Sequence, residues 1–230
     1  ASGLREDIGL EIKARSNPKL RTILNNKDQY PDAMIQSLYR NEELIDFVYN
    51  YPSKKGHVYT NTIGPVTKGR YPLLLQYDQR WGYGRYGYNV IGMNGCGPSS
   101  AAMIIAGLTG RNNITPFDVA SYAYSHGYYQ DGTSWSFFTE GMKHYGIYGR
   151  NIPLSYSSMK NEIMNGRPLI CSMKPGDFTT TGHLIVIRGM KQGMFIVNDP
   201  NSIKRSNRLW SYDTLSKQIK NMWSFSRQHY

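Results

Sequence analysis

A cysteine between two glycines at the start of an apolar helix constrains this chain more than any other feature. Cys96 stands in the segment Gly95–Pro98 and is followed by the apolar run 101–106. Proline is favoured in the first helical turn, where its missing N–H has no partner to lose. The pattern therefore predicts a tight turn and then a helix over about Gly97–Leu108, with the cysteine at its N-terminus.

The N-terminus of a helix is a favourable place for a reactive thiol. Unpaired backbone N–H groups and the positive end of the helix dipole both stabilise a thiolate over a thiol. The glycines on either side of Cys96 would let a substrate backbone come close. A lone cysteine of this kind more often packs a helix start as a small buried residue, so the functional interpretation needs partners elsewhere in the chain.

His183 is the candidate partner, because a thiolate nucleophile needs a base and the base needs an orienting group. It precedes the apolar, β-branched run 184–187, which is typical of a buried strand. A second strand-like run, 193–198, follows a turn signal at 191–193. Pairing the two runs as a hairpin returns Asp199 to the side of His183, where its carboxylate can accept the imidazole N–H. Taken alone, the same aspartate before a proline is an ordinary strand-ending turn.

The other histidines have weaker cases for chemistry. His57 lies beside a basic turn, His126 and His144 fall near the ends of expected helices, and His229 is in the tail. A histidine near a helix C-terminus meets the negative end of the dipole, which is a structural role. No cluster has the spacing of zinc ligands, and there is no phosphate-binding loop or dinucleotide fingerprint. We therefore predict neither a metal nor a cofactor.

From about Tyr71 to Trp223, the sequence resembles a known family. This family is the papain-like cysteine peptidases related to the bacteriocin-processing (double-glycine leader) peptidases, and the likeness is strongest to stand-alone secreted or cell-wall members in Gram-positive bacteria. The matching segments agree in order and spacing: Leu75–Gly82, Gly95–Ser99, Gly132–Trp135, Gly166–Ile170, Pro175–Thr179, Gly182–Val186 and Asn198–Pro200. Each segment alone is a weak signal, but the combination is specific.

The resemblance implies an activity and the residues that carry it. Cys96 would be the nucleophile, His183 the base and Asp199 the orienting acid of a peptidase that works through a thioester. An upstream glutamine would complete the oxyanion hole, with Gln76 as the first candidate and Gln79 as the rival. The same machinery can pass the acyl group to another amine, so a cysteine acyltransferase or amidase stays open beside hydrolysis. An inactive binding module that kept the fold is the third alternative.

The order of the expected elements predicts the fold class. Further helices are expected over Thr115–Gly127, Ser134–Tyr145, Tyr156–Asn165 and Tyr212–Met222, and strands from Leu169, His183 and Phe195. Helices followed by antiparallel strands give an α+β class. The resemblance implies the papain-like layout, in which a helical side carries the cysteine and a sheet carries the histidine.

The first 70 residues are predicted to form a helical extension and linker, followed by a catalytic domain over residues 71–230. Capping residues, prolines and first-turn acids indicate short helices near 19–24, 33–39 and 44–49. Two interpretations of this extension are open. It is either a substrate-recognition or inhibitory segment, or a packing extension with no function of its own.

Charge and composition limit the partners. The chain has 230 residues, a formal net charge of +11 and 40% hydrophobic residues, enough for a core. A basic surface attracts polyanions, but no nucleic-acid-binding signature is present, so we expect no specific nucleic-acid partner. We expect a peptide or peptidoglycan-like substrate. An anionic cell-wall polymer as the counter-charge and plain solubility are two open explanations of the charge.

The second cysteine and the cellular location complete the expectations. Cys171 lies in an apolar run and is expected to be an inert buried thiol, although a disulfide with Cys96 is open on the sequence alone. The sequence contains no transmembrane run and no signal peptide. An extracellular or cell-surface location therefore comes from the resemblance and not from a visible signal.

Overall fold

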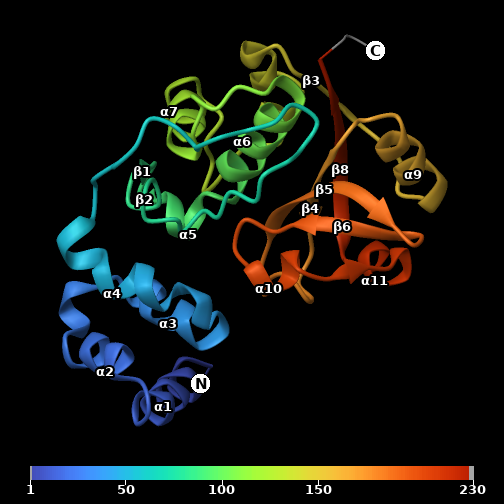
Figure 1. Ribbon diagram of the computed structural model, residues 1–230. Helices are drawn as coiled ribbons and strands as arrows, with labels where there is room; N and C mark the ends of the chain where they lie inside the picture. Colours follow the sequence, from blue (N-terminus) through green and yellow to red (C-terminus); the bar gives the residue numbers. More distant parts are fainter. Residues whose placement is uncertain (1, 228–230) are drawn as a thin grey trace.

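The computed structural model describes residues 2–227, and Figure 1 shows three parts that follow one another along the chain. Helices from the first quarter form one body, a second group of helices carries Cys96, and the last third forms an antiparallel sheet. This arrangement confirms the predicted α+β class. None of the helices in the described part is long and apolar enough to cross a membrane.

The N-terminal body is a bundle of short helices. It consists of α1 (Ser2–Ala14), α2 (Pro18–Asn25), α3 (Asp32–Arg40) and α4 (Ile45–Lys54), with the 3-10 turns η1 (Lys27–Gln29) and η2 (Glu42–Leu44). The Asn17 side chain caps α2 by accepting the backbone N–H of Leu20. The three predicted helices are confirmed. α1 was not predicted, and Gly3 and Gly9 weaken the helical signal of its sequence.

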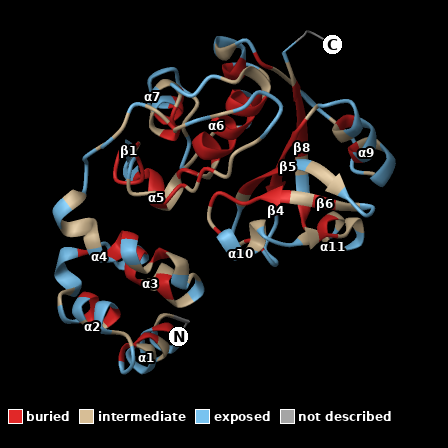
Figure 2. Cartoon of the chain, in the orientation of Figure 1, coloured by how far each residue is buried: buried red, intermediate tan, exposed pale blue. Residues whose placement is uncertain are grey.

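The apolar side of this bundle is covered by the next part of the chain. Phe47 of α4 stacks on Tyr83, with ring centroids 4.4 Å apart, and the Tyr83 hydroxyl donates to the Phe47 carbonyl oxygen. Tyr77 and Val90 belong to the same buried cluster (red in Figure 2). The helical extension therefore shares a hydrophobic core with the residues that lead to Cys96.

The central helix of the second part is α6 (Cys96–Thr109). It follows the hairpin of β1 (Arg85–Tyr86) and β2 (Asn89–Val90) and the one-turn helix α5 (Ile91–Asn94). All residues from 97 to 107 are buried, because α7 (Pro116–Ser125) packs on one side and the sheet on another. A helix that is apolar all round belongs in a core. The prediction of α6 is confirmed to within one residue at each end.

The single helix predicted over Ser134–Tyr145 is wrong. The structure has α8 (Ser136–Thr139) and then the 3-10 helix η3 (Gly141–Tyr145). The ring of Phe137 occupies the space that a side chain at position 141 would need. Phe137 and Phe138 are both fully buried, so packing two adjacent aromatic rings into the core outweighs a regular helical spacing.

The sheet has the strand order β3-β8-β4-β5-β6-β7, and all its neighbours are antiparallel. Its strands are β3 (Tyr148–Asn151), β4 (Leu169–Met173), β5 (His183–Lys191), β6 (Met194–Asn198), β7 (Leu209–Trp210) and β8 (Ile219–Ser226). The helices α9 (Tyr156–Met164), α10 (Ile203–Ser206) and α11 (Tyr212–Ser216) connect them. Ile170 contacts the core around α6, whereas Leu169 and Cys171 face a second core on the other side of the sheet.

The hairpin of β5 and β6 is confirmed, and its turn has the geometry expected from the sequence. Gln192 and Gly193 have φ angles of 54° and 75°, the left-handed conformation that two-residue hairpin turns require. Val186 pairs with Asn198 at the other end of the ladder. The hairpin thus returns the residue after β6 to the beginning of β5.

The helix predicted over Tyr212–Met222 is also wrong. α11 ends at Ser216, and Ile219–Ser226 forms β8, which lies between β3 and β4. Met222, Trp223 and Phe225 are buried. Backbone hydrogen bonding to a strand on each side decides the conformation of this segment, and such partners are invisible to local sequence patterns.

We expect Phe47→Ala to destabilise the whole protein, because the lost ring leaves a cavity between the bundle and the part of the chain that carries Cys96. Removing a buried phenylalanine costs about 3–5 kcal/mol. Urea unfolding, followed by tryptophan fluorescence and by far-ultraviolet circular dichroism, should show one transition shifted to lower urea with both probes. An unchanged fluorescence transition would show that the bundle does not support the core around Cys96.

Candidate active site

Cys96 is held at the junction of the bundle, α6 and the sheet. Its thiol is half-buried at the N-terminus of α6, where first-turn N–H groups lack intrahelical acceptors. Gly97 lies directly against Thr133, whose hydroxyl is 2.7 Å from the Tyr86 hydroxyl. The expected role of this glycine in admitting a substrate backbone stays a prediction, and the structure gives the glycine a packing role. Its missing side chain makes room for Thr133.

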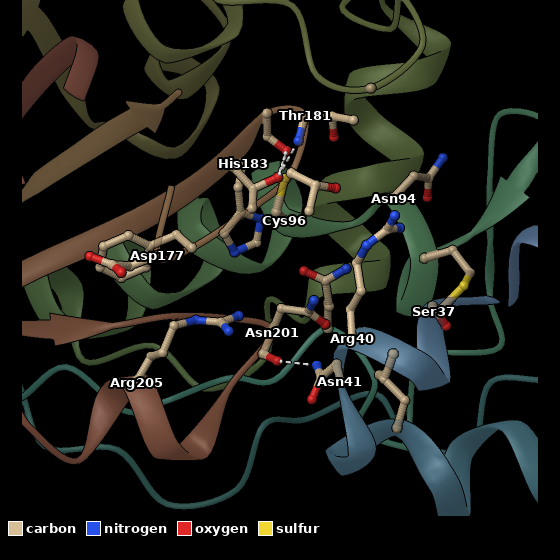
Figure 3. A pocket seen from close by; sticks show the side chains of 18 of the residues that line it. Ser37, Arg40, Asn41, Asn94, Cys96, Asp177, Thr181, His183, Asn201 and Arg205 are labelled. Atoms are coloured by element: carbon tan, nitrogen blue, oxygen red, sulfur yellow. Dashed lines mark hydrogen bonds between the residues drawn. The ribbon is translucent and has the colours of Figure 1, made fainter. Parts of the chain in front are cut away.

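His183 lies beside Cys96 at the beginning of β5 (Figure 3). Its Nε2–H donates to Oδ1 of Asp199 over 2.7 Å, so Nδ1 is the ring nitrogen left for the thiol. Burial opposes a charge on the ring, but the Asp199 carboxylate and hydrogen bonds to Asp199 and Cys96 outweigh it and raise the pKa of His183 to about 10. The geometry therefore favours a charged imidazole.

Asp199 is a fully buried carboxylate with several donors around it. Burial alone would raise the pKa of Asp199, but the positive charges of His183 and Arg205 hold it below its usual value. Nε of Arg205 lies 2.6 Å from Oδ2, and the backbone N–H of Asn201 donates to Oδ1 over 2.8 Å. The acid is therefore ionised and rigidly oriented.

Arg205 is a site residue that the sequence analysis misses. In the sequence it is one of a pair of adjacent basic residues, with no pattern that links it to Asp199. The α10 turn brings it back toward the carboxylate, because Ser202 caps this helix by accepting the backbone N–H of Arg205. The sequence signal that was available is Ser202, a helix-capping residue three positions before Arg205, which indicates a helical turn here.

The structure separates the two candidate glutamines. Gln76 is buried and lines the same cleft as Cys96, and its Nε2 donates to the Gly92 carbonyl oxygen over 3.1 Å. Gln79 is bonded instead to Asn50 and Lys54 and is not among the residues that line the cleft. Only Gln76 of this pair shares the cleft with the thiol.

The cleft has a volume of about 620 Å³ and runs between the bundle and the sheet. Residues 176–182, before β5, form one wall. The opposite wall comes from α3 and the turn after it, through Ser37, Arg40, Asn41 and Leu44. Figure 3 shows Arg40 and Asn41 extending from this bundle beneath Cys96 and His183. The N-terminal helices are thus part of the cleft itself.

The imidazole of His183 contacts both a thiol at the end of a helix and a buried carboxylate beside an antiparallel sheet. These are the kinds of group that a papain-like cysteine peptidase uses. The model of the Peptidase_C39 like family matches residues 68–229. This chain belongs to that family. It is therefore a cysteine peptidase, and the resemblance expected from the sequence is confirmed.

A solved peptidase domain is similar to this chain in structure. The peptidase domain of Streptococcus ComA, a bifunctional ABC transporter involved in a quorum-sensing pathway, is 20% identical, with a TM-score of 0.47. The match covers 69% of this chain and 100% of that domain. No protein with a curated functional description matches this chain.

The second cysteine and the other described histidines lie away from the cleft. Cys171 is buried in β4, both cysteines are free, and burial raises the pKa of the Cys171 thiol. The disulfide that the sequence left open is therefore absent. His57, His126 and His144 are exposed and do not line the cleft, and His229 lies outside the described residues. Within residues 2–227, no group of three or more His, Cys, Asp or Glu side chains is arranged so that it could hold a metal ion.

We expect the stabilisation that His183 provides to depend on pH. The pKa of its ring rises from 6.5 to about 10 on folding, so the contribution is complete below the unfolded pKa and is lost as the pH rises through the folded one. The unfolding free energy of the wild type minus that of His183→Ala, from urea titrations across this range, should fall with rising pH. A difference that grows with pH would contradict a charged imidazole.

Proposed function

We propose that Cys96, His183 and Asp199 carry out the hydrolysis of peptide bonds through a thioester intermediate. The observation that supports this most is the position of His183, which contacts both the thiol and the buried carboxylate inside one cleft. A base that is itself oriented by an acid is the arrangement that activates a nucleophile.

The reaction starts with the Cys96 proton already on Nδ1 of His183, so that sulfur is present as the thiolate beside the charged imidazole. The thiolate attacks the carbonyl carbon of the substrate and forms a tetrahedral oxyanion. His183 then gives its proton to the leaving amine as the C–N bond breaks, and the acyl group stays on sulfur as a thioester. Water attacks the thioester with His183 as the base, and the carboxylate product leaves.

The oxyanion of this reaction needs donors near Cys96. The backbone N–H of Cys96 is one, and Nε2 of Gln76 is the second, because only one of its hydrogens is needed for Gly92. Asn94 also lines the cleft, but its Nδ2 donates to the Tyr86 carbonyl oxygen and to the Tyr129 hydroxyl. This use of both amide hydrogens favours Gln76.

The proposed substrate is a peptide at the bacterial surface, either a cell-wall peptide or a secreted peptide. The enzyme itself would be extracellular. The net charge of +11 supports this, since it would hold the enzyme near anionic cell-wall polymers. The cleft of about 620 Å³, between the bundle and the loop of residues 176–182, supports a peptide as the substrate.

Assays on purified peptidoglycan fragments and on a peptide library test the function. We expect the wild type to release a new carboxylate and a new amine, and Cys96→Ala to be inactive with its circular dichroism unchanged. His183→Ala should lose activity by a similar factor, because the two residues act as a unit. With an added primary amine, a product that joins the amine to the acyl group would identify a transferase, and equal turnover by Cys96→Ala would refute the mechanism.

The glutamine pair gives a matched test of the oxyanion hole. Gln76→Ala should lower kcat by roughly 10²–10³, the usual loss for one oxyanion donor, with little change in KM. Gln79→Ala removes a glutamine that bonds only Asn50 and Lys54, so its kcat should stay near the wild-type value. Equal losses in the two variants would remove Gln76 from the mechanism.

A further inference from the structure

Glu43 of η2 connects the N-terminal bundle to the loop that carries the acid of the site. Its Oε2 accepts the Ser202 hydroxyl over 2.7 Å. Its Oε1 accepts the backbone N–H of Ile203 over 2.7 Å and the Tyr77 hydroxyl over 3.1 Å. A carboxylate that accepts three bonds from two distant parts of the chain is a strong and directional anchor.

The loop that Glu43 holds depends on Ser202. The Ser202 side chain accepts the N–H of Arg205, and its carbonyl oxygen accepts the Ser206 hydroxyl. The Ser206 hydroxyl oxygen accepts the backbone N–H of Asp199 over 2.8 Å. Glu43 is therefore joined to both Asp199 and Arg205 through a continuous chain of hydrogen bonds.

A second contact ties the same two parts together. Nδ2 of Asn41 donates to the Asn201 carbonyl oxygen over 2.8 Å, and Oδ1 of Asn41 accepts the N–H of Glu43. Figure 3 shows the first of these bonds below Cys96. Asn201 in turn donates its N–H to Asp199. The bundle is thus connected to the Asp199 carboxylate through two neighbouring loop residues, Asn201 and Ser202.

We propose that Glu43 is a positioning residue of the active site, through which the N-terminal bundle orients Asp199 and keeps His183 aligned with Cys96. This rests on the proposed triad. The loop after Asp199 contains the four-residue α10 and one isolated bridge, between Asp199 and Ser202. It is also held at Pro200, whose carbonyl oxygen accepts the backbone N–H of Gln76 over 2.7 Å. Without Glu43, Ser202 and Ile203 lose their common acceptor, and the carboxylate can shift relative to His183.

Glu42 is the matched control for this proposal. It is the neighbouring glutamate on the same turn, but it is exposed and pairs with Lys13 inside the bundle over 2.9 Å. It makes no bond to the loop of Asp199 among the contacts of the described residues. A variant at this position removes the same charge from the same turn and leaves the loop intact.

The test measures the alkylation rate of Cys96 by iodoacetamide in the folded, full-length protein, with mass spectrometry to separate Cys96 from Cys171. At about pH 6, we expect Glu43→Ala to react roughly tenfold or more slowly, since small misplacements at a site can cost up to about a hundredfold. Near pH 9 the rates should converge, because a free thiol then ionises without its partner. Glu42→Ala should stay within about twofold of the wild type at both values.

Further variants separate a positioning role from simple destabilisation. Glu43→Gln keeps the shape and can accept from Ile203 while its amide donates to Ser202, so it should recover most of the rate at about pH 6. If Glu43→Ala only lowers the melting temperature and keeps the pH profile of alkylation, the positioning role is wrong. His183→Ala tests the proposed triad separately. If this variant keeps the wild-type pH profile of Cys96 alkylation, the triad itself is wrong. If His183→Ala loses the fast alkylation at about pH 6 but Glu43→Ala keeps it, only the role of Glu43 is wrong.

Discussion

The burial of one carboxylate, Asp199, organises this molecule. A charged group without access to water is costly unless partners surround it. Here the partners come from β5, from α10 and from the intervening backbone, through His183, Arg205 and Asn201. Asn201 and Arg205 belong to one loop, and Glu43 of the bundle holds this loop through Ser202 and Ile203. The sheet and the loop therefore both have to be in place before this charge is compensated.

The hydrophobic architecture explains why Cys96 lies opposite His183. α6 is buried along nearly its whole length, so its direction is determined by the sheet and by α7. At its N-terminus, Cys96 packs against the core around α6 and lines the cleft together with His183 of β5 and with residues of the bundle. The thiol is half-exposed at the N-terminal end of this helix, before the buried residues 97–107, and this gives it access to a substrate.

Local signals were sufficient wherever the deciding contacts lie within a few residues. The helix start at Cys96, the cap at Asn17 and the turn at Gln192–Gly193 depend on adjacent residues, and all three were predictable. The helices expected at 134–145 and 212–222 failed because their apolar residues also suit other conformations. At 219–226, pairing with two neighbouring strands decided the outcome.

The sequence by itself determined the family, the α+β class and the candidate residues Cys96, His183 and Asp199, since the motifs and the hairpin are local features. Tertiary structure alone decided that Gln76 and not Gln79 lines the cleft, that Arg205 pairs with the acid and that Glu43 reaches the same loop. Glu43 and Ser202 are separated by 159 residues. Contacts over such separations depend on how whole elements pack, and no spacing in the sequence encodes them.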